Sequence, residues 1–298
     1  MRMKPSDLLL GVVVTIIWGS NFSVIELGLG QLDPFLLTAL RFTFSAFPLV
    51  LIVKRPADVK LVSIAAYGVV FGVGLWWVVN LAMHLGMSPG LSSLILQFSA
   101  FFTIILSSLL FRERISRVQI AGMVVAASGL AMIIHLTRGT TTTSGVVLVL
   151  LAAASWSVCN MIIKACRPRD MIAFIAWSSA FAAPVLFALT WVAEGNRPFV
   201  GLYHHFGGAA AFSVFFQAYV TTVFGYMVWN NLMKKYPAAM VAPLSLIVPI
   251  SGLITSYLAF DEHLSGGMWI AIATVLGGIA IFINSGRIPS LFTRSHTA

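Results

Sequence analysis

Long apolar runs alternate with short polar segments along the whole chain, and this alternation is the main structural signal in the sequence. Each run is close to the length of about 20 apolar residues that an α-helix needs to cross a bilayer. The connections are short, and the longest extends over residues 194–208. The pattern predicts ten transmembrane helices, at residues 8–28, 35–53, 61–83, 89–111, 116–134, 145–165, 172–193, 209–232, 240–260 and 266–284.

One part of this pattern, residues 89–116, recurs after a shift of 149 positions. Five runs precede the loop at residues 135–144 and five follow it, so the second copy enters the membrane from the opposite side. We therefore predict two inverted five-helix repeats, residues 1–138 and 139–298, a plan that recurs in secondary transporters. The alternative is a duplication that serves packing alone. The shift aligns Phe111, Glu113, Trp77 and Gly129 with Phe260, Glu262, Tyr226 and Gly278.

Composition supports a membrane protein. The chain is 59% hydrophobic and only 9% charged, whereas a soluble domain has about 25% charged residues. We therefore predict an all-α integral membrane protein. This prediction limits the function to processes that take place within the bilayer.

The net charge of +9 is an orientation signal. Most of the 18 Lys and Arg residues lie in segments on one side of the predicted membrane, whereas Arg138 and Arg197 lie on the other side. Cytoplasmic loops of membrane proteins carry such an excess of basic residues. The distribution predicts that both termini are cytoplasmic, and it removes the need for a nucleic-acid partner.

Aromatic and polar side chains within several predicted helices indicate a central cavity. Trp and Tyr offer flat apolar area with one polar group, and amides both donate and accept hydrogen bonds. Such a lining suits a small zwitterion with an apolar or moderately polar side chain. The alternative for each residue is an ordinary interhelical hydrogen bond or a place in an interface belt. The predicted substrate-binding residues are Trp18, Asn21, Trp77, Asn80, Gln97, Trp156, Asn160, Tyr226 and Ser245.

Arg41 is a basic residue inside a predicted span, and an intramembrane charge is a functional candidate by default. It binds a substrate carboxylate, pairs with Glu26 at the outer mouth, or extends outward to the interface; of these the ion pair is favoured. We group Glu26, Arg41 and His84 as predicted gate residues. Pro243 and Pro249 each remove a backbone donor from the ninth helix and are predicted hinges.

Enzymatic and metal chemistry are weakly indicated. The nine acidic residues are spread over loops and helix ends, without the converging acid, base and nucleophile that catalysis requires. Cys159 and Cys166 have no accompanying His or second Cys pair, so they suggest core residues rather than a metal site or a disulfide. We expect no cofactor, no metal and no enzyme; a membrane-embedded transferase is the alternative.

Small residues mark the fifth and tenth predicted helices. They let helices approach closely, which indicates a scaffold or a dimer face. We expect a monomer or a weak dimer. The residues are Gly122, Ala126 and Gly129 in one helix and Ala273, Gly277 and Gly278 in the other.

Four segments carry a resemblance to a known family: Trp18-Gly-Ser-Asn21-Phe22, Leu40-Arg41-Phe42, residues 90–103, and residues 241–249 followed by Asp261-Glu262. Over nearly its whole length the chain resembles the EamA-type drug/metabolite transporters of the DMT superfamily. It is most similar to bacterial exporters of amino acids and their metabolites, including the cysteine/O-acetylserine and aromatic amino acid types. The resemblance implies ten helices in two inverted halves, cytoplasmic termini, and efflux across the bacterial inner membrane.

These observations predict an exporter of amino acids or related small metabolites, aromatic or other neutral amino acids among them. Transport is expected to proceed by alternating access through the central aromatic-lined cavity, in contact with the small-molecule substrate and the lipid bilayer. The alternatives are a flippase for a lipid-linked or amphipathic metabolite and a drug efflux carrier. A cavity open laterally to lipid would favour the flippase.

Overall fold

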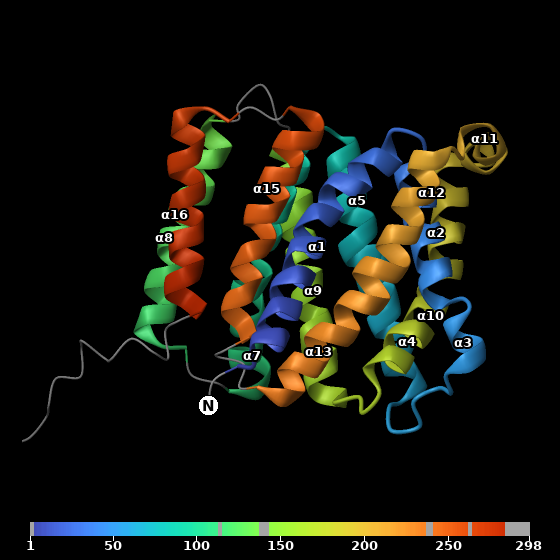
Figure 1. Cartoon of the computed structure of the whole chain (residues 1–298), viewed down its shortest axis with the longest axis horizontal. Coiled ribbons are helices and arrows are strands. Elements are labelled where there is room, and N and C mark those ends of the chain that lie inside the picture. Colours follow the sequence, from blue (N-terminus) through green and yellow to red (C-terminus); the bar gives the residue numbers. More distant parts are fainter. Residues whose placement is uncertain (1–2, 113–114, 137–142, 237–240, 262–263, 284–298) are drawn as a thin grey trace, which may run out of the picture.

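The computed structural model describes residues 3–112, 115–136, 143–236, 241–261 and 264–283, and within these ranges every regular element is a helix (Figure 1). Eight helical spans are long and apolar enough to cross a membrane, and two shorter apolar helices, Leu244–Phe260 and Gly266–Phe282, follow them. The predicted all-α membrane fold with ten crossings is confirmed.

Five crossings are continuous α-helices and five are interrupted. The continuous helices are α1 (Pro5–Leu29), α8 (Arg117–Leu136), α9 (Thr143–Cys166), α10 (Met171–Glu194) and α16 (Gly266–Ile283). The interrupted crossings are α2 (Pro34–Ala46) with α3 (Leu49–Ile52); α4 (Leu61–Val69), η1 (Val70–Trp77) and α5 (Val78–His84); α6 (Pro89–Leu96) with α7 (Ser99–Phe111); α12 (Gly208–Phe215), η2 (Phe216–Phe224) and α13 (Gly225–Lys235); and η3 (Ala242–Leu246) with α15 (Ile247–Phe260).

Four of the five interruptions occur at equivalent places in the two halves; the break between α2 and α3 has no counterpart in α10. η1 and η2 are both π-helical segments, and they interrupt the third and the eighth crossings. The break between α6 and α7 at Gln97 corresponds, after the shift of 149, to the change from η3 to α15 at Leu246. Arg112 and Asp261, which are related by the same shift, both end their helices in the left-handed conformation, with φ of 57° and 54°. The repeat seen in the sequence is therefore repeated in the backbone; Glu113 and Glu262 lie outside the described residues.

One helix was not predicted. Residues 194–208 were expected to form a loop, but they contain α11 (Arg197–His205), which lies at one end of the molecule (Figure 1). Pro198 occupies the first turn, where a missing N–H costs nothing. Phe199 packs near the rings of Phe187 and Trp191, with centroid distances of 6.2 and 6.0 Å, so it holds α11 against α10.

The crossings pack as a bundle with α1 near its centre. α1 contacts α15, α12, α13 and η2, whereas α10 packs against α2 and α4 at the far side. α8 and α16 form a pair at the opposite edge of the bundle (Figure 1). These two helices are the fifth crossings of the two halves, so the scaffold expected from their small residues is present.

Two adjacent glycines of α16 provide a matched test of this packing. A Cβ on Gly278 would overlap the Ala126 amide nitrogen and lie 2.7 Å from the Gly122 carbonyl oxygen, whereas a Cβ on Gly277 would meet nothing within 4 Å. We expect Gly278→Ala to lower the melting temperature of the detergent-purified protein, because overpacking costs about 1–3 kcal/mol. Gly277→Ala should leave it unchanged or raise it slightly, since Ala favours the helix. Equal melting temperatures for the two variants would contradict this packing.

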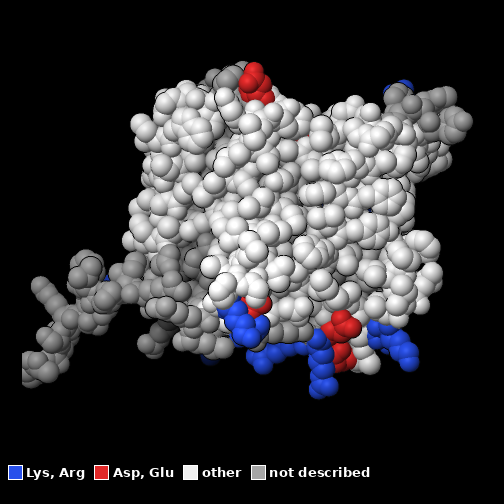
Figure 2. Space-filling view, viewed as in Figure 1, with Lys and Arg blue, Asp and Glu red and all other residues white. Residues whose placement is uncertain are grey.

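Basic residues gather at one end of the bundle. Figure 2 shows Lys and Arg along the end at which α1 begins, beneath a broad uncharged band. We call this end the basic face; among its exposed side chains are Lys4, Lys54, Arg55, Arg169 and Lys235. Glu194 and Asp261 lie at the ends of crossings on the opposite face, and Arg197 lies there at the beginning of α11.

Candidate functional site

Four aromatic rings meet at the centre of the bundle and define the aromatic cluster: Trp18 of α1, Phe71 of η1, Trp156 of α9 and Tyr226 of α13. The ring centroid of Tyr226 lies 5.3 Å from that of Trp18, 5.7 Å from that of Phe71 and 6.0 Å from that of Trp156. Phe71 and Trp156 are 5.6 Å apart. The cluster therefore joins helices of the first half to helices of the second.

Three of these residues were predicted from the sequence, and Phe71 was missed. A phenylalanine among 22 carries no signal of its own. Its place one turn before the paired tryptophans of η1, beside Gly72, could have indicated it. Trp18 is held in position because its indole N–H donates to the Thr221 carbonyl oxygen at 3.1 Å.

The centre of the bundle is packed rather than hollow. The sequence predicted a water-filled cavity lined by aromatic residues, but the rings of the aromatic cluster contact one another at the distances that aromatic pairs prefer. A small space of about 10 Å³ borders the cluster at Tyr226 and Thr222. That volume is at the lower limit for a single water molecule, so this conformation has no room for a substrate at the cluster.

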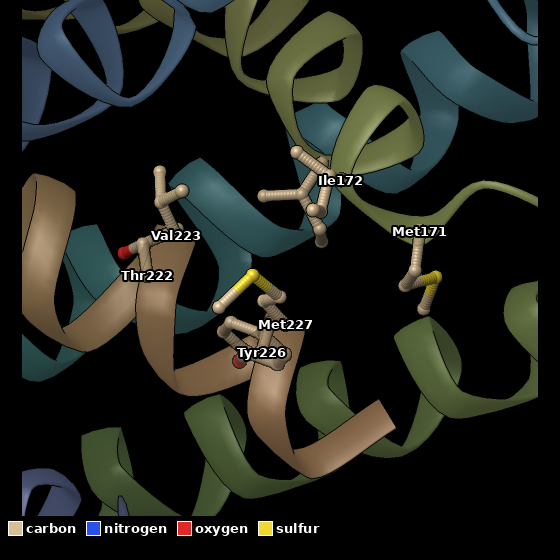
Figure 3. Close-up of a pocket in the computed structure, with 7 residues that line it drawn as sticks. Met171, Ile172, Thr222, Val223, Tyr226 and Met227 are labelled. Atoms are coloured by element: carbon tan, nitrogen blue, oxygen red, sulfur yellow. The ribbon is translucent and has the colours of Figure 1, made fainter. Parts of the chain in front are cut away.

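A larger cavity of about 320 Å³, here called the vestibule, lies between the beginning of α10 and the end of α13. Its lining is polar at Arg169, Asp170, Asn230 and Asn231, and apolar at Met171, Ile172 and Met227. The three apolar residues also line the small space at Tyr226. Figure 3 shows Ile172 of α10 projecting toward the segment that carries Val223 and Met227. The vestibule thus opens near the basic face and narrows at Met171, Ile172 and Met227, which we call the neck.

Arg41 lies beyond the neck, with a side chain only 1% exposed. Its Nη2 donates to the Thr222 hydroxyl oxygen at 3.1 Å and its Nη1 donates to the Gln217 amide oxygen at 3.3 Å. The guanidinium carbon lies 3.9 Å from the centre of the Trp76 ring. Thr222 lines the small space beside Tyr226, so Arg41 is one side chain away from that space.

The two acceptors of Arg41 are themselves held in place. Gln217 donates its amide N–H to the Ser213 hydroxyl at 2.9 Å, and Ser213 donates to the Val24 carbonyl oxygen at 2.6 Å. Thr222 donates to the Gln217 carbonyl oxygen at 2.8 Å, within the π-helical segment η2. π-Helical segments within α-helices frequently occur at functional sites. Gln217 was not predicted from the sequence.

The ion pair favoured for Arg41 is not formed. Glu26 makes no salt bridge to it, and one Glu26 carboxylate oxygen is buried without a hydrogen-bond partner. Arg41 instead turns toward the second half, where it meets the amide and hydroxyl of η2. His84 is exposed at the end of α5. The three predicted gate residues therefore do not form one gate in this conformation.

The predicted asparagines each bridge two helices. Asn21 accepts from the Thr221 hydroxyl at 2.9 Å, Asn80 donates to the Thr38 hydroxyl at 2.8 Å, and Asn160 donates to the Thr103 hydroxyl at 3.0 Å. Asn21 and Asn80 are fully buried. All three asparagines therefore form interhelical hydrogen bonds, which was the alternative to lining a cavity. Asn21 remains next to the site, because Thr221 also accepts from Trp18.

The other predicted residues lie away from the aromatic cluster. Trp77 stacks on Phe35 with centroids 4.6 Å apart. Gln97 is half-buried at the break between α6 and α7, and Ser245 is half-buried in η3. Of the two predicted hinges, Pro243 lies in the 3-10 segment η3, whereas Pro249 lies in the first turn of the regular helix α15.

A polar contact at the basic face joins the two helices that carry Trp18 and Tyr226. Asp7 of α1 accepts hydrogen bonds from Lys235 and from the Tyr236 hydroxyl, both at the end of α13. The hydrogen bond to Asp7 raises the pKa of Lys235 above its usual value. α1 and α13 are therefore tied together at this face, next to the vestibule.

Comparisons with known proteins agree with this architecture. The chain is 33% identical over 286 residues to a protein of Escherichia coli (strain K12) named "Probable amino-acid metabolite efflux pump", covering 94% of this chain and 95% of that protein. A protein of the same name from Salmonella typhimurium (strain LT2) is 32% identical, covering 96% and 97% of the two chains. A solved crystal structure has the same fold, with 20% identity, a TM-score of 0.59, and coverage of 94% and 98%.

The family that matches is described as the EamA-like transporter family, and it matches twice, over residues 6–135 and 143–284. These two ranges cover nearly all of both halves, and they agree with the resemblance seen in the sequence motifs. The chain belongs to the EamA-like transporter family.

Proposed function

We propose that this protein exports a small amino acid, or a metabolite derived from one, across the bacterial inner membrane by alternating access between two halves, residues 1–138 and 139–298. The observation that carries the proposal is the aromatic cluster, to which both halves contribute rings and behind which the buried Arg41 lies. The names of the two relatives, both probable amino-acid metabolite efflux pumps, support the same substrate class.

The charge distribution supports an orientation of the protein in the membrane. Cytoplasmic loops carry the excess of Lys and Arg, so we assign the basic face to the cytoplasmic side and keep the prediction that both termini are cytoplasmic. The vestibule opens near this face. The described conformation is therefore one in which a cytoplasmic substrate reaches the neck but not yet the aromatic cluster.

Movement of the two halves needs places where the backbone yields. η1 and η2, the break at Gln97, and η3 interrupt the helical hydrogen bonding at matching positions. Broken helices in membrane proteins recur where substrates bind between inverted repeats. We assign the change between inward and outward access to these four places, with Pro243 in the last of them and Pro249 in the first turn of α15 that follows it.

The vestibule lining favours a water-soluble substrate over a lipid. Its rim carries charged and amide side chains at Arg169, Asp170, Asn230 and Asn231, which an acyl chain would have to desolvate. A flippase for an amphipathic metabolite is therefore the weaker assignment. The oligomeric state and the absence of a nucleic-acid partner stay as predictions.

Transport by the purified protein in liposomes tests the proposal. Liposomes loaded with L-phenylalanine, L-cysteine or L-threonine are diluted into trace radiolabelled amino acid, and counterflow is measured against protein-free liposomes. We expect saturable counterflow for at least one of the three. Uptake equal to that of protein-free liposomes for all three, at every concentration, would refute the proposed substrate class.

A further inference from the structure

Arg41 is a buried cation whose described partners are all uncharged. Its side chain is 1% exposed, and the groups around the guanidinium are the Gln217 amide, the Thr222 hydroxyl and the rings of Trp76 and Phe42. Two of its five N–H donors are used by Gln217 and Thr222, while the buried Nε has no hydrogen-bond partner. Among the described residues no carboxylate pairs with it.

Such an arrangement is costly unless an anion joins it during function. A charged residue in the membrane is normally paired, and a buried charge without a counterion is strongly unfavourable. The guanidinium also has a planar set of donors that matches a carboxylate in two parallel hydrogen bonds. Its surroundings leave one edge, at Nε, without an acceptor.

A route leads from the basic face to this group. The vestibule of about 320 Å³ and the small space at Tyr226 share Met171, Ile172 and Met227. The small space ends at Thr222, which is hydrogen-bonded to Arg41. A molecule that passes the neck therefore meets the uncharged side chains of Thr222 and Tyr226 first, and Arg41 lies directly behind Thr222.

We propose that Arg41 binds the carboxylate of the transported metabolite, with Thr222 and Gln217 as the neutral groups that orient its guanidinium. The inference rests on the proposed function and narrows it: the substrate must carry a free carboxylate, and its side chain would lie against the aromatic cluster. Because Arg41 belongs to α2 and its two partners belong to η2, a carboxylate bound there contacts both halves of the protein.

The opposing explanation is that Arg41 only holds α2 against η2. That role predicts that any change at Arg41 lowers stability without changing which substrates are preferred. A second opposing explanation is a pair with Glu26 in another conformation. Both are separated from carboxylate binding by comparing each amino acid with its carboxamide, which has the same side chain and ammonium group but no carboxylate.

The experiment measures counterflow in liposomes of L-phenylalanine, L-cysteine and L-threonine, each against its carboxamide. For wild type we expect the transported acid to be preferred by at least about tenfold in KM. Arg41→Met should raise the KM of the acid by about 10- to 150-fold, the value of a hydrogen bond to a charged group, and should leave the carboxamide nearly unchanged. Arg41→Lys keeps the charge without the paired geometry, so part of the preference should return.

Gln217→Glu is the sharpest variant, because it places a carboxylate of nearly the same shape where the amide oxygen now accepts from Nη1 at 3.3 Å. A resident carboxylate should compete with the substrate and raise the KM of the acid by at least about tenfold, while protein stability is kept or raised. If Arg41 only held helices together, this variant would transport normally. Glu26→Gln serves as the control, and it should leave the acid preference intact.

The outcomes are distinguishable. No saturable flux of any of the three acids through wild type would refute the proposed function itself. Flux of an acid and its carboxamide with equal KM would refute the role of Arg41 and leave the exporter assignment standing. If Arg41→Met fails to elute as a monodisperse protein, the wild-type preference and the Gln217→Glu variant decide. If Glu26→Gln no longer preferred the amino acid over its carboxamide, the preference would depend on an ion pair between Glu26 and Arg41, and the inference would be overturned.

Discussion

Gly19→Val is expected to abolish the folded protein. A Cβ at this position would overlap the Ser251 hydroxyl oxygen and the Val248 carbonyl oxygen, and it would lie 2.8 Å from the Gly252 amide nitrogen. Two of these atoms belong to the backbone of α15, which cannot move away without separating the whole helix from α1. Overpacking a core costs about 1–3 kcal/mol even where side chains can adjust, so a clash with backbone is expected at or above the upper end.

Gly11 of the same helix provides the matched control. There a Cβ would meet only the ends of two flexible side chains, Leu244 at 2.6 Å and Leu232 at 3.1 Å. We expect Gly11→Val to give a monodisperse peak in size-exclusion chromatography after extraction in mild detergent, at a yield near that of wild type. Gly19→Val should give aggregated material or none. A normal peak for Gly19→Val would show that α1 and α15 do not cross this closely in the membrane.

Tyr226→Ala is expected to reduce saturable transport by at least about tenfold without loss of folded protein. Tyr226 contacts three other rings of the aromatic cluster, and each such contact is worth about 0.5–1.5 kcal/mol. Tyr226 also borders the small space beyond the neck, so the substitution removes the ring against which a substrate side chain would lie, and a tenfold loss of transport requires about 1.4 kcal/mol of that interaction. The measurement is the initial rate of counterflow in liposomes as a function of substrate concentration.

Two variants control this result. Tyr226→Phe keeps all three ring contacts and should transport within about twofold of wild type. Trp77→Ala removes a large aromatic residue that occupies the equivalent position of the first repeat but stacks on Phe35 instead, so it should affect transport less than Tyr226→Ala. If Trp77→Ala were the more damaging of the two, the site would lie nearer the opposite face than the aromatic cluster indicates.

Most of the fold could be predicted from the sequence. In a bilayer every backbone polar group must be satisfied within the chain, so apolar runs of sufficient length become helices whatever their neighbours are. The repeat was visible because residues 89–116 recur after a shift of 149 positions, and the same shift relates Arg112 and Asp261, whose backbone conformations agree. The break at Pro48 was not predicted, although a proline removes a backbone donor there. The break at Gln97 and the π-helical segments were not predicted either, because their residues carry no comparable local signal.

The site was predicted less completely. Trp18, Trp156 and Tyr226 were predicted as aromatic residues of the substrate site, and the structure brings them together with Phe71. Asn80 and Asn160 were predicted as amide groups of the same lining, yet they form hydrogen bonds between helices elsewhere. A polar residue in mid-membrane needs a partner in either case, so residue type and depth alone do not distinguish a binding group from a structural one.

The sequence by itself determined the membrane class, the ten crossings and the repeat, because hydrophobic length and charge asymmetry act on each helix separately. Only the tertiary structure decided the partner of Arg41, which turns to Gln217 and Thr222 rather than to Glu26. It also showed that the aromatic cluster is packed, and that the larger cavity, the vestibule, lies between this cluster and the basic face. Both results depend on how the crossings are rotated and paired, and those are set by side-chain contacts between residues far apart in the chain.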